Sequence, residues 1–149
     1  MNLISSKTVN ARENIFWEPL PEEWIALPAK RVLVLSLPFE TDSVEESTLL
    51  KMLGGCALTQ QDFNILQIQP GQRVAWHALN DHFKPKQIIM LGVESAQFGI
   101  SAMFLFNEMN KFYDCTFIPS LSLQQLDQYP DAKKTLWLQA LKPCFLPSA

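Results

Sequence analysis

The chain has 149 residues, of which 48% are hydrophobic and 11% aromatic, and a formal net charge of −3 at pH 7. This composition predicts one globular domain with a sizeable core and excludes a disordered chain. The negative charge argues against a protein that binds nucleic acid or anionic membranes by charge alone, so we expect weak, strongly salt-dependent DNA binding at most. No apolar run approaches the roughly 20 residues of a membrane span, and no signal-like apolar core is present near the start, so no membrane association and a cytoplasmic location are expected.

The first part of the chain lacks helical or strand periodicity and is predicted to form an N-terminal arm, residues 1–30, that is partly mobile. It precedes a domain at 31–149. Phe16, Trp17 and Trp24 are interleaved with acidic residues and prolines, which restrict the backbone to irregular structure. These tryptophans either cover one edge of the core or form a docking site, because exposed aromatic rings are frequent anchors of protein interfaces. Partner-binding residues are therefore expected at Phe16, Trp17 and Trp24.

The remaining chain alternates between short apolar runs and amphipathic segments. The apolar runs predict strands buried on both faces at 32–37, 63–68, 87–91 and 115–118. The amphipathic segments predict helices at 44–53, 74–83, 94–98 and 130–141, with one further helical turn at 22–26 and a short β-ribbon within 101–114. Ser43 and Glu46 form a capping box for the helix at 44–53, and Pro143 is expected to stop the last helix. Strands that alternate with helices imply right-handed βαβ units and an α/β fold with about four parallel strands.

The residues that commonly hold metals or clusters are widely spaced. Cys56, Cys115 and Cys144 show no CxxC spacing, and His77 and His82 lie five residues apart, which is not the i, i+4 spacing of a helical metal pair. We therefore expect inert thiols, no metal site and no cofactor.

The loop after the first strand is the expected location of any chemistry, because ligands of open parallel sheets bind beyond the carboxyl ends of the strands. Three segments in this order resemble the uracil-DNA glycosylase superfamily, most closely its small bacterial branch. They are Leu35–Phe39 with 45–58, Lys84–Ala96, and Ile118–Leu141. The resemblance implies a three-layer α/β/α sandwich with a four-stranded parallel sheet.

The same resemblance implies that the catalytic motifs are lost. The family's Gly-Glu-Ala-Pro-Gly-like loop matches Leu35–Phe39, where only the proline is retained, and the histidine of its His-Pro-Ser motif matches Ile118. The asparagine that reads uracil aligns loosely with Gln67, and the iron–sulfur ligands of larger members are absent. No catalytic residue is therefore expected, and the vestigial positions are Ser36, Leu37, Pro38, Phe39, Glu40, Gln67, Ile118, Pro119 and Ser120.

A second, weaker similarity concerns the C-terminal third and the tryptophan-containing arm. The pattern of Leu126, Pro130, Ala132, Trp137 and Leu141 is similar to that of the psi subunit of bacterial DNA polymerase III, a clamp-loader accessory. The combined prediction is a non-catalytic protein-interaction subunit whose partner is a replication or repair protein. Two alternatives stay open: a divergent base-excision glycosylase with Glu40 or Asp42 as base and Gln67 as base reader, and an unrelated small-molecule-binding α/β domain.

Overall fold

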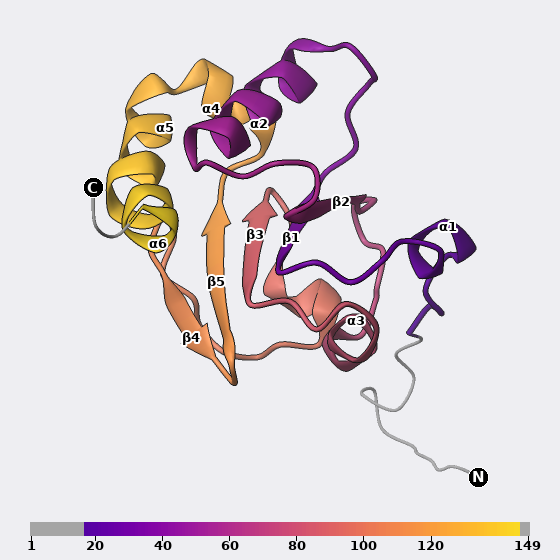
Figure 1. The fold of residues 1–149 in the computed structure, drawn as a ribbon. Helices are drawn as coiled ribbons and strands as arrows, with labels where there is room; N and C mark the ends of the chain where they lie inside the picture. The colour runs from indigo at the N-terminus through magenta and orange to yellow at the C-terminus, as the bar shows by residue number, and fades with distance from the viewer. Residues whose placement is uncertain (1–16, 147–149) are drawn as a thin grey trace, which may run out of the picture.

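The computed structural model describes residues 17–146, so the predicted mobile start of the arm and Phe16 lie outside the described residues. A five-stranded mixed sheet runs through the molecule in the order β2-β1-β3-β5-β4 (Figure 1). Its strands are β1 (Val32–Ser36), β2 (Phe63–Gln67), β3 (Gln87–Leu91), β4 (Asn110–Phe112) and β5 (Cys115–Ser120). The α/β class is confirmed. The predicted sheet was incomplete, because β4 adds an edge strand that pairs antiparallel with β5, whereas the other pairings are parallel.

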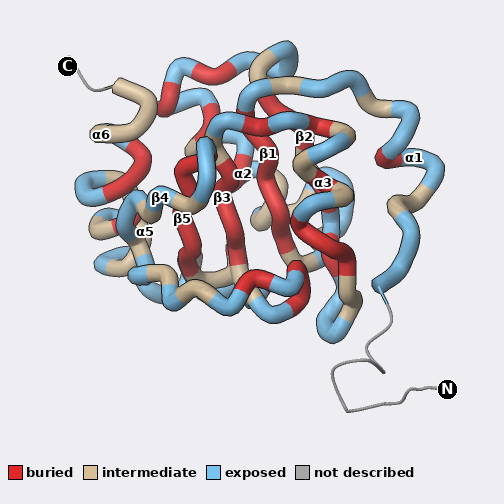
Figure 2. The backbone as a smooth tube through the Cα atoms, turned by 90° about the horizontal axis from the view of Figure 1, so that it is seen from below, coloured by how far each residue is buried: buried red, intermediate tan, exposed pale blue. Residues whose placement is uncertain are grey.

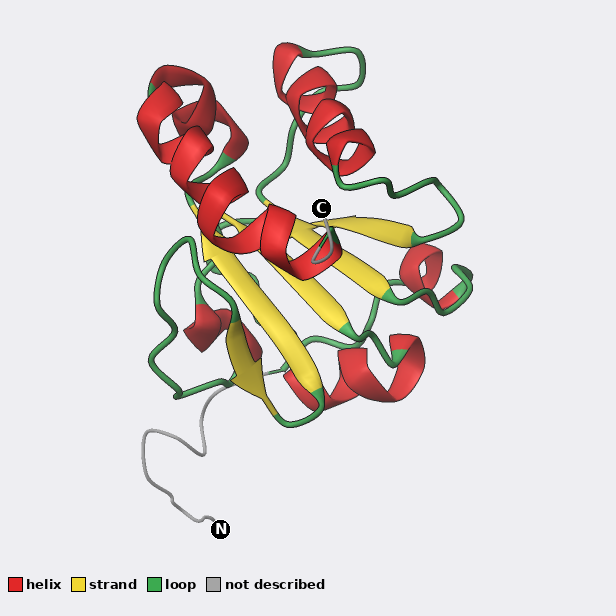
Figure 3. Cartoon of the chain, turned by 60° about the vertical axis from the view of Figure 1, so that its left-hand side comes forward, coloured by secondary structure: helices red, strands yellow, loops and turns green. Residues whose placement is uncertain are grey.

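Helices cover both faces of this sheet (Figures 1 and 3). They are α1 (Glu22–Ile25), α2 (Val44–Gly55), α3 (Trp76–Phe83), the 3₁₀ helix η2 (Ser95–Phe98), α4 (Leu123–Gln128), α5 (Pro130–Leu136), the π-helical η3 (Trp137–Leu141) and α6 (Lys142–Phe145). Throughout residues 17–146, no helix combines the length and apolarity that crossing a membrane requires.

Two hydrophobic cores result from the alternation of side chains along the central strands, which Figure 2 shows as buried. Leu33 and Leu35 of β1 point to one face, and Val32 and Val34 to the other. The first face carries the aromatic core, which includes Trp24, Trp76, Phe83, Phe98 and Phe117. The second carries the aliphatic core, which includes Leu49, Leu53, Ile89, Ile118, Leu126, Leu136 and Leu141. Burial on both faces explains why the strands read as continuous apolar runs.

The described part of the N-terminal arm packs along the domain. The Glu18 amide donates to the Arg73 carbonyl at 2.9 Å, and the Asn64 side chain donates to the Pro28 carbonyl at 2.8 Å. Trp24 is only 7% exposed and belongs to the aromatic core. In this conformation its ring is therefore a core element and not an exposed anchor.

The C-terminal helix differs from the prediction at Pro143. The helical run does not stop there but continues as α6 to Phe145. The Lys142 amide bonds to the Trp137 carbonyl in the i→i−5 pattern of a π-turn. Since proline lacks an amide donor and crowds the carbonyl four residues earlier, a widened turn directly ahead of it lets the helix continue.

Candidate functional site

The carboxyl edge of the sheet has a topological switch point between β1 and β3. The chain passes from β1 to β2 on one side and then crosses over to β3 on the other side of β1. In open α/β sheets such a point leaves a crevice in which ligands bind. The loops that meet there begin at Leu37 after β1 and at Gly92 after β3.

This crevice is filled by protein atoms. Gly92 has a φ of +80°, and a Cβ on it would lie 2.9 Å from Leu37 Cδ1 and 2.7 Å from Ser122 Cβ. The Leu37 amide also donates to the Leu91 carbonyl at 3.2 Å, and its side chain packs against the aromatic core. The loops after β1, β3 and β5 are therefore in contact, and not even one added carbon fits between Gly92, Leu37 and Ser122.

The rest of the loop after β1 is also used for packing. Phe39 is partly buried against the aliphatic core, and its amide donates to Gln67 Oε1 at 3.2 Å. Gln67, the predicted base reader, thus uses its side-chain oxygen to hold the loop after β1. Pro38 and Glu40 are exposed, as is Asp42, whose amide donates to Glu46 Oε1 at 2.8 Å. Neither Glu40 nor Asp42 is enclosed as a general base in a water-excluding site would be.

The positions that match the His-Pro-Ser motif are all buried. Ile118 lies within the aliphatic core. The Ser120 hydroxyl donates to Asn107 Oδ1 at 2.6 Å, and the Asn107 amide donates to the Pro119 carbonyl at 2.8 Å. The Ser36 hydroxyl donates to the Leu37 carbonyl at 2.8 Å. Both serines are therefore engaged in holding loops, and neither has a base as its hydrogen-bond acceptor.

A groove of about 480 Å³ lies one strand farther along the same edge, beyond β3 and β5. It is bordered by the segment 103–109, which we call the apolar loop. Four large side chains of this loop are exposed: Met103 (95%), Leu105 (61%), Phe106 (56%) and Met109 (44%). The predicted β-ribbon included this segment, although only 110–112 forms a strand. In the sequence, the apolar run Met103–Phe106 was the signal that could have revealed this exposed surface.

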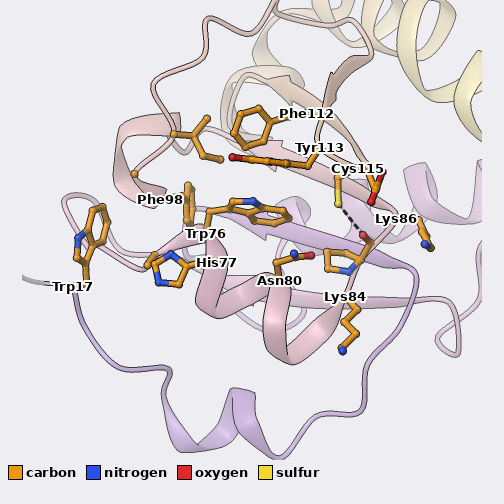
Figure 4. Close-up of a pocket in the computed structure, with 15 residues that line it drawn as sticks. Trp17, Trp76, His77, Asn80, Lys84, Lys86, Phe98, Phe112, Tyr113 and Cys115 are labelled. Atoms are coloured by element: carbon orange, nitrogen blue, oxygen red, sulfur yellow. Dashed lines mark hydrogen bonds between the residues drawn. The ribbon is translucent and has the colours of Figure 1, made fainter.

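A second cavity, of about 590 Å³, lies near the amino ends of β3 and β5 (Figure 4). We call it the aromatic cavity. It is formed by α3, the Lys84–Lys86 segment, the C-terminal end of η2 and the β4–β5 turn. Trp17 borders it and packs on Gly99, where a Cβ would lie 2.9 Å from the indole. Of Trp17 and Trp24, the two predicted docking residues within the described part of the chain, Trp17 is the one that lies at a cavity with a partly exposed ring.

The thiols are suited to packing and not to chemistry. Burial, with a smaller effect from Cys144, raises the pKa of the Cys56 thiol to about 12. Burial also raises the pKa of Cys115, whose Sγ donates to the Pro85 carbonyl at 2.8 Å. Since the thiolate is the reactive form, neither is activated as a nucleophile. Across the described residues, no group of three histidine, cysteine or acidic side chains is placed to share a metal ion.

The structure thus brings the loop residues Leu37 and Phe39 into packed contacts at the carboxyl edge, with Gln67 bonded to the same loop. It leaves Glu40 in solvent and places Ile118 in the core. Two features were absent from the predicted site, namely the apolar loop and the aromatic cavity. Compared with known proteins, the sequence matches no protein-family model and no curated protein.

Proposed function

We propose that the protein is a non-catalytic protein of uracil-DNA glycosylase-like fold that acts as a protein-interaction subunit. Its partner in this proposal is a replication or repair protein, and its role is analogous to that of the psi accessory of the DNA polymerase III clamp loader. The observation that carries the proposal is the carboxyl edge, where Leu37 and Gly92 close the switch point with packed atoms.

The residue chemistry at that edge supports the same view. Cleavage of a glycosidic bond needs a positioned water, stabilisation of the departing base and a pocket for the flipped nucleotide. Ile118 has no side-chain hydrogen-bond donor, and it is buried in the aliphatic core. Glu40 is an exposed carboxylate on a loop. The divergent-glycosylase alternative therefore has a candidate base but no pocket around it.

The apolar loop is the surface that we assign to partner binding. Its exposed side chains are two methionines, a leucine and a phenylalanine, all within one short segment. Contiguous exposed apolar surface of this kind is typical of protein interfaces, and methionine adapts its shape to a partner. Three hydrogen bonds between the Asn110 side chain and the backbone of Leu105 and Glu108 hold the loop in shape. The loop therefore presents a preformed surface, which lowers the entropic cost of binding.

We expect no uracil release from single-stranded DNA that contains uracil, measured by cleavage of the abasic product on a denaturing gel. The reason is the filled crevice between Leu37 and Gly92. Glu40→Gln is the matched variant, since it removes the exposed carboxylate that lies nearest to β1 in the sequence while preserving its size. Turnover by the wild type that disappears in Glu40→Gln would refute the non-catalytic assignment.

The partner assignment predicts that Leu105→Ser/Phe106→Ser loses a specific replication or repair protein in affinity purification followed by mass spectrometry. Serine removes apolar area from the loop without touching the core, because both side chains are largely exposed. Leu138→Ser is the matched control, since Leu138 is also about half exposed but lies on η3. Trp17→Ala tests the arm in the same experiment. Identical protein sets from the wild type, the loop variant and the arm variant would contradict a role for either surface.

A further inference from the structure

The aromatic cavity combines ring surfaces with cationic side chains. Figure 4 shows the Trp76 indole on one side and the Tyr113 ring above it, while Lys84 and Lys86 border one end of the cavity and extend outward from the rings. Trp76 is 9% exposed and belongs to the aromatic core, where it makes an edge-to-face contact with Phe117 at a centroid distance of 5.1 Å, so it forms the floor of the cavity. A cavity of this volume falls within the range of small-ligand sites. It lies at the opposite edge of the sheet from the filled crevice.

Tyr113 occupies a backbone position that suits glycine. Phe112 and Cys115 pair across the β4–β5 hairpin, so Tyr113 and Asp114 form a two-residue turn. The φ of Tyr113 is +54°, and two-residue turns with a positive φ at the first position favour glycine. The ring is also 81% exposed and gains one edge-to-face contact, with Phe112. Folding alone therefore gives little reason for a large aromatic residue here, and strained positions of this kind gather at functional sites.

The charges around the cavity favour an anionic ligand. Lys84 and Lys86 are exposed, and Lys84 is held in a left-handed conformation as the cap of α3, with a φ of +47°. Asp114 is the one carboxylate among the lining residues. Asn80 lies between the aromatic walls and the lysines in Figure 4, and its carboxamide can both donate and accept a hydrogen bond.

We propose that the aromatic cavity binds a nucleotide, with its base stacked on the exposed Tyr113 ring and its phosphate near Lys84 and Lys86. A nucleobase supplies the planar π surface that stacks on aromatic rings, and its polar edge suits the Asn80 carboxamide. A phosphate supplies the negative charge that two ammonium groups attract. The nucleotide is either free in solution or the end of a single strand, since both present the same chemistry. This site is independent of the protein-interaction function proposed above.

The test measures binding of adenosine 5′-monophosphate, adenosine, and a short single-stranded oligonucleotide with a 5′-phosphate by quenching of tryptophan fluorescence and by calorimetry. The wild type is expected to bind the monophosphate saturably, and more tightly than adenosine. Tyr113→Asn should weaken this binding about 10-fold, because stacking on one ring is lost. Asparagine tolerates the left-handed backbone, so the turn is retained.

Matched variants separate the ring from the fold. Tyr113→Phe keeps the ring and should bind within about 2-fold of the wild type, since phenylalanine offers the same stacking surface. Lys84→Gln/Lys86→Gln should lower the affinity for the monophosphate but leave adenosine unchanged. Tyr129→Ala, at an exposed tyrosine between α4 and α5, should have no effect. Tighter binding of the oligonucleotide assigns the ligand to a strand end, and tighter binding of the monophosphate assigns it to a free nucleotide. Absence of saturable binding at millimolar concentration, or full binding by Tyr113→Asn, would overturn the proposal.

Discussion

Phe117→Ala is expected to lower the free energy of unfolding by about 3–5 kcal/mol, which is the usual cost of removing a buried phenylalanine. Phe117 is 1% exposed and lies on β5 at the centre of an aromatic group. Its ring centroid lies 4.9 Å from Phe104, 5.1 Å from Trp76 and 5.6 Å from Phe112. The residual cavity would remove the ring that these three side chains all contact. The loss is a large share of the total free energy of unfolding, which is only about 5–15 kcal/mol for a domain of this size.

This effect is measured by urea unfolding followed by fluorescence and circular dichroism. Phe106→Ala is the matched control, because Phe106 is 56% exposed and its truncation should cost less than about 0.5 kcal/mol. Phe104 stacks on Phe117 with an interplanar angle of 28°, so Phe117→Ala should also loosen the apolar loop. Faster hydrogen exchange at 103–109 would report this loosening. A loss equal to that of Phe106→Ala would show that the aromatic core does not depend on Phe117.

Gly92→Ala is expected to destabilise the protein by about 2–5 kcal/mol, from two additive causes. The left-handed backbone costs an L-residue about 1–2 kcal/mol, and crowding of a packed site costs about 1–3 kcal/mol. At Gly92 the added Cβ would lie 2.7 Å from Ser122 Cβ, 2.9 Å from Leu37 Cδ1 and 3.0 Å from Ser122 Cα. The Ser122 Cα belongs to the backbone and cannot rotate away, so the loops would have to separate.

Gly71→Ala separates these two causes. Gly71 has a φ of +79°, close to the +80° of Gly92, but a Cβ added to Gly71 would meet no atom within 4 Å. Gly71→Ala should therefore show only the backbone cost, of about 1–2 kcal/mol. The difference between the two variants in thermal or urea unfolding measures how tightly the carboxyl edge is closed. Equal losses would mean that the crevice between Leu37 and Gly92 has room for a ligand, and this would weaken the proposed function.

Local signals predicted several elements because the relevant interactions are local. The N-cap of α2 is an example: the helix begins at Val44, and the Glu46 amide donates to Ser43 Oγ at 3.2 Å. The second half of the predicted capping box does not form, because the Glu46 carboxylate accepts from the Asp42 amide instead of the Ser43 amide. Ser122 and Gln125 form a complete capping box at α4, a helix that was not predicted although the same S-x-x-[E/Q] signal was present. The continuous apolar runs located β1, β2, β3 and β5 for a related reason, since a strand buried on both faces needs apolar residues at successive positions.

Other features depend on partners far away in the sequence. The burial of Trp24 requires the aromatic core on which the arm packs. Segments of this kind carry too little local pattern to reveal which face they will cover, so their placement could not be predicted.

The candidate site likewise combines features set by the local sequence with features set by distant contacts. By itself the sequence determined the α/β class and the residue types found in the loop after β1 and along β5. The tertiary structure alone decided that Leu37, Gly92 and Ser122 meet and close the carboxyl edge. It also decided that Trp76 and Lys84, from α3 and its cap, border one cavity with Tyr113 of the β4–β5 turn. The physical reason is that residue type is a local property, whereas a crevice or cavity exists only through distances between loops that the sheet brings together.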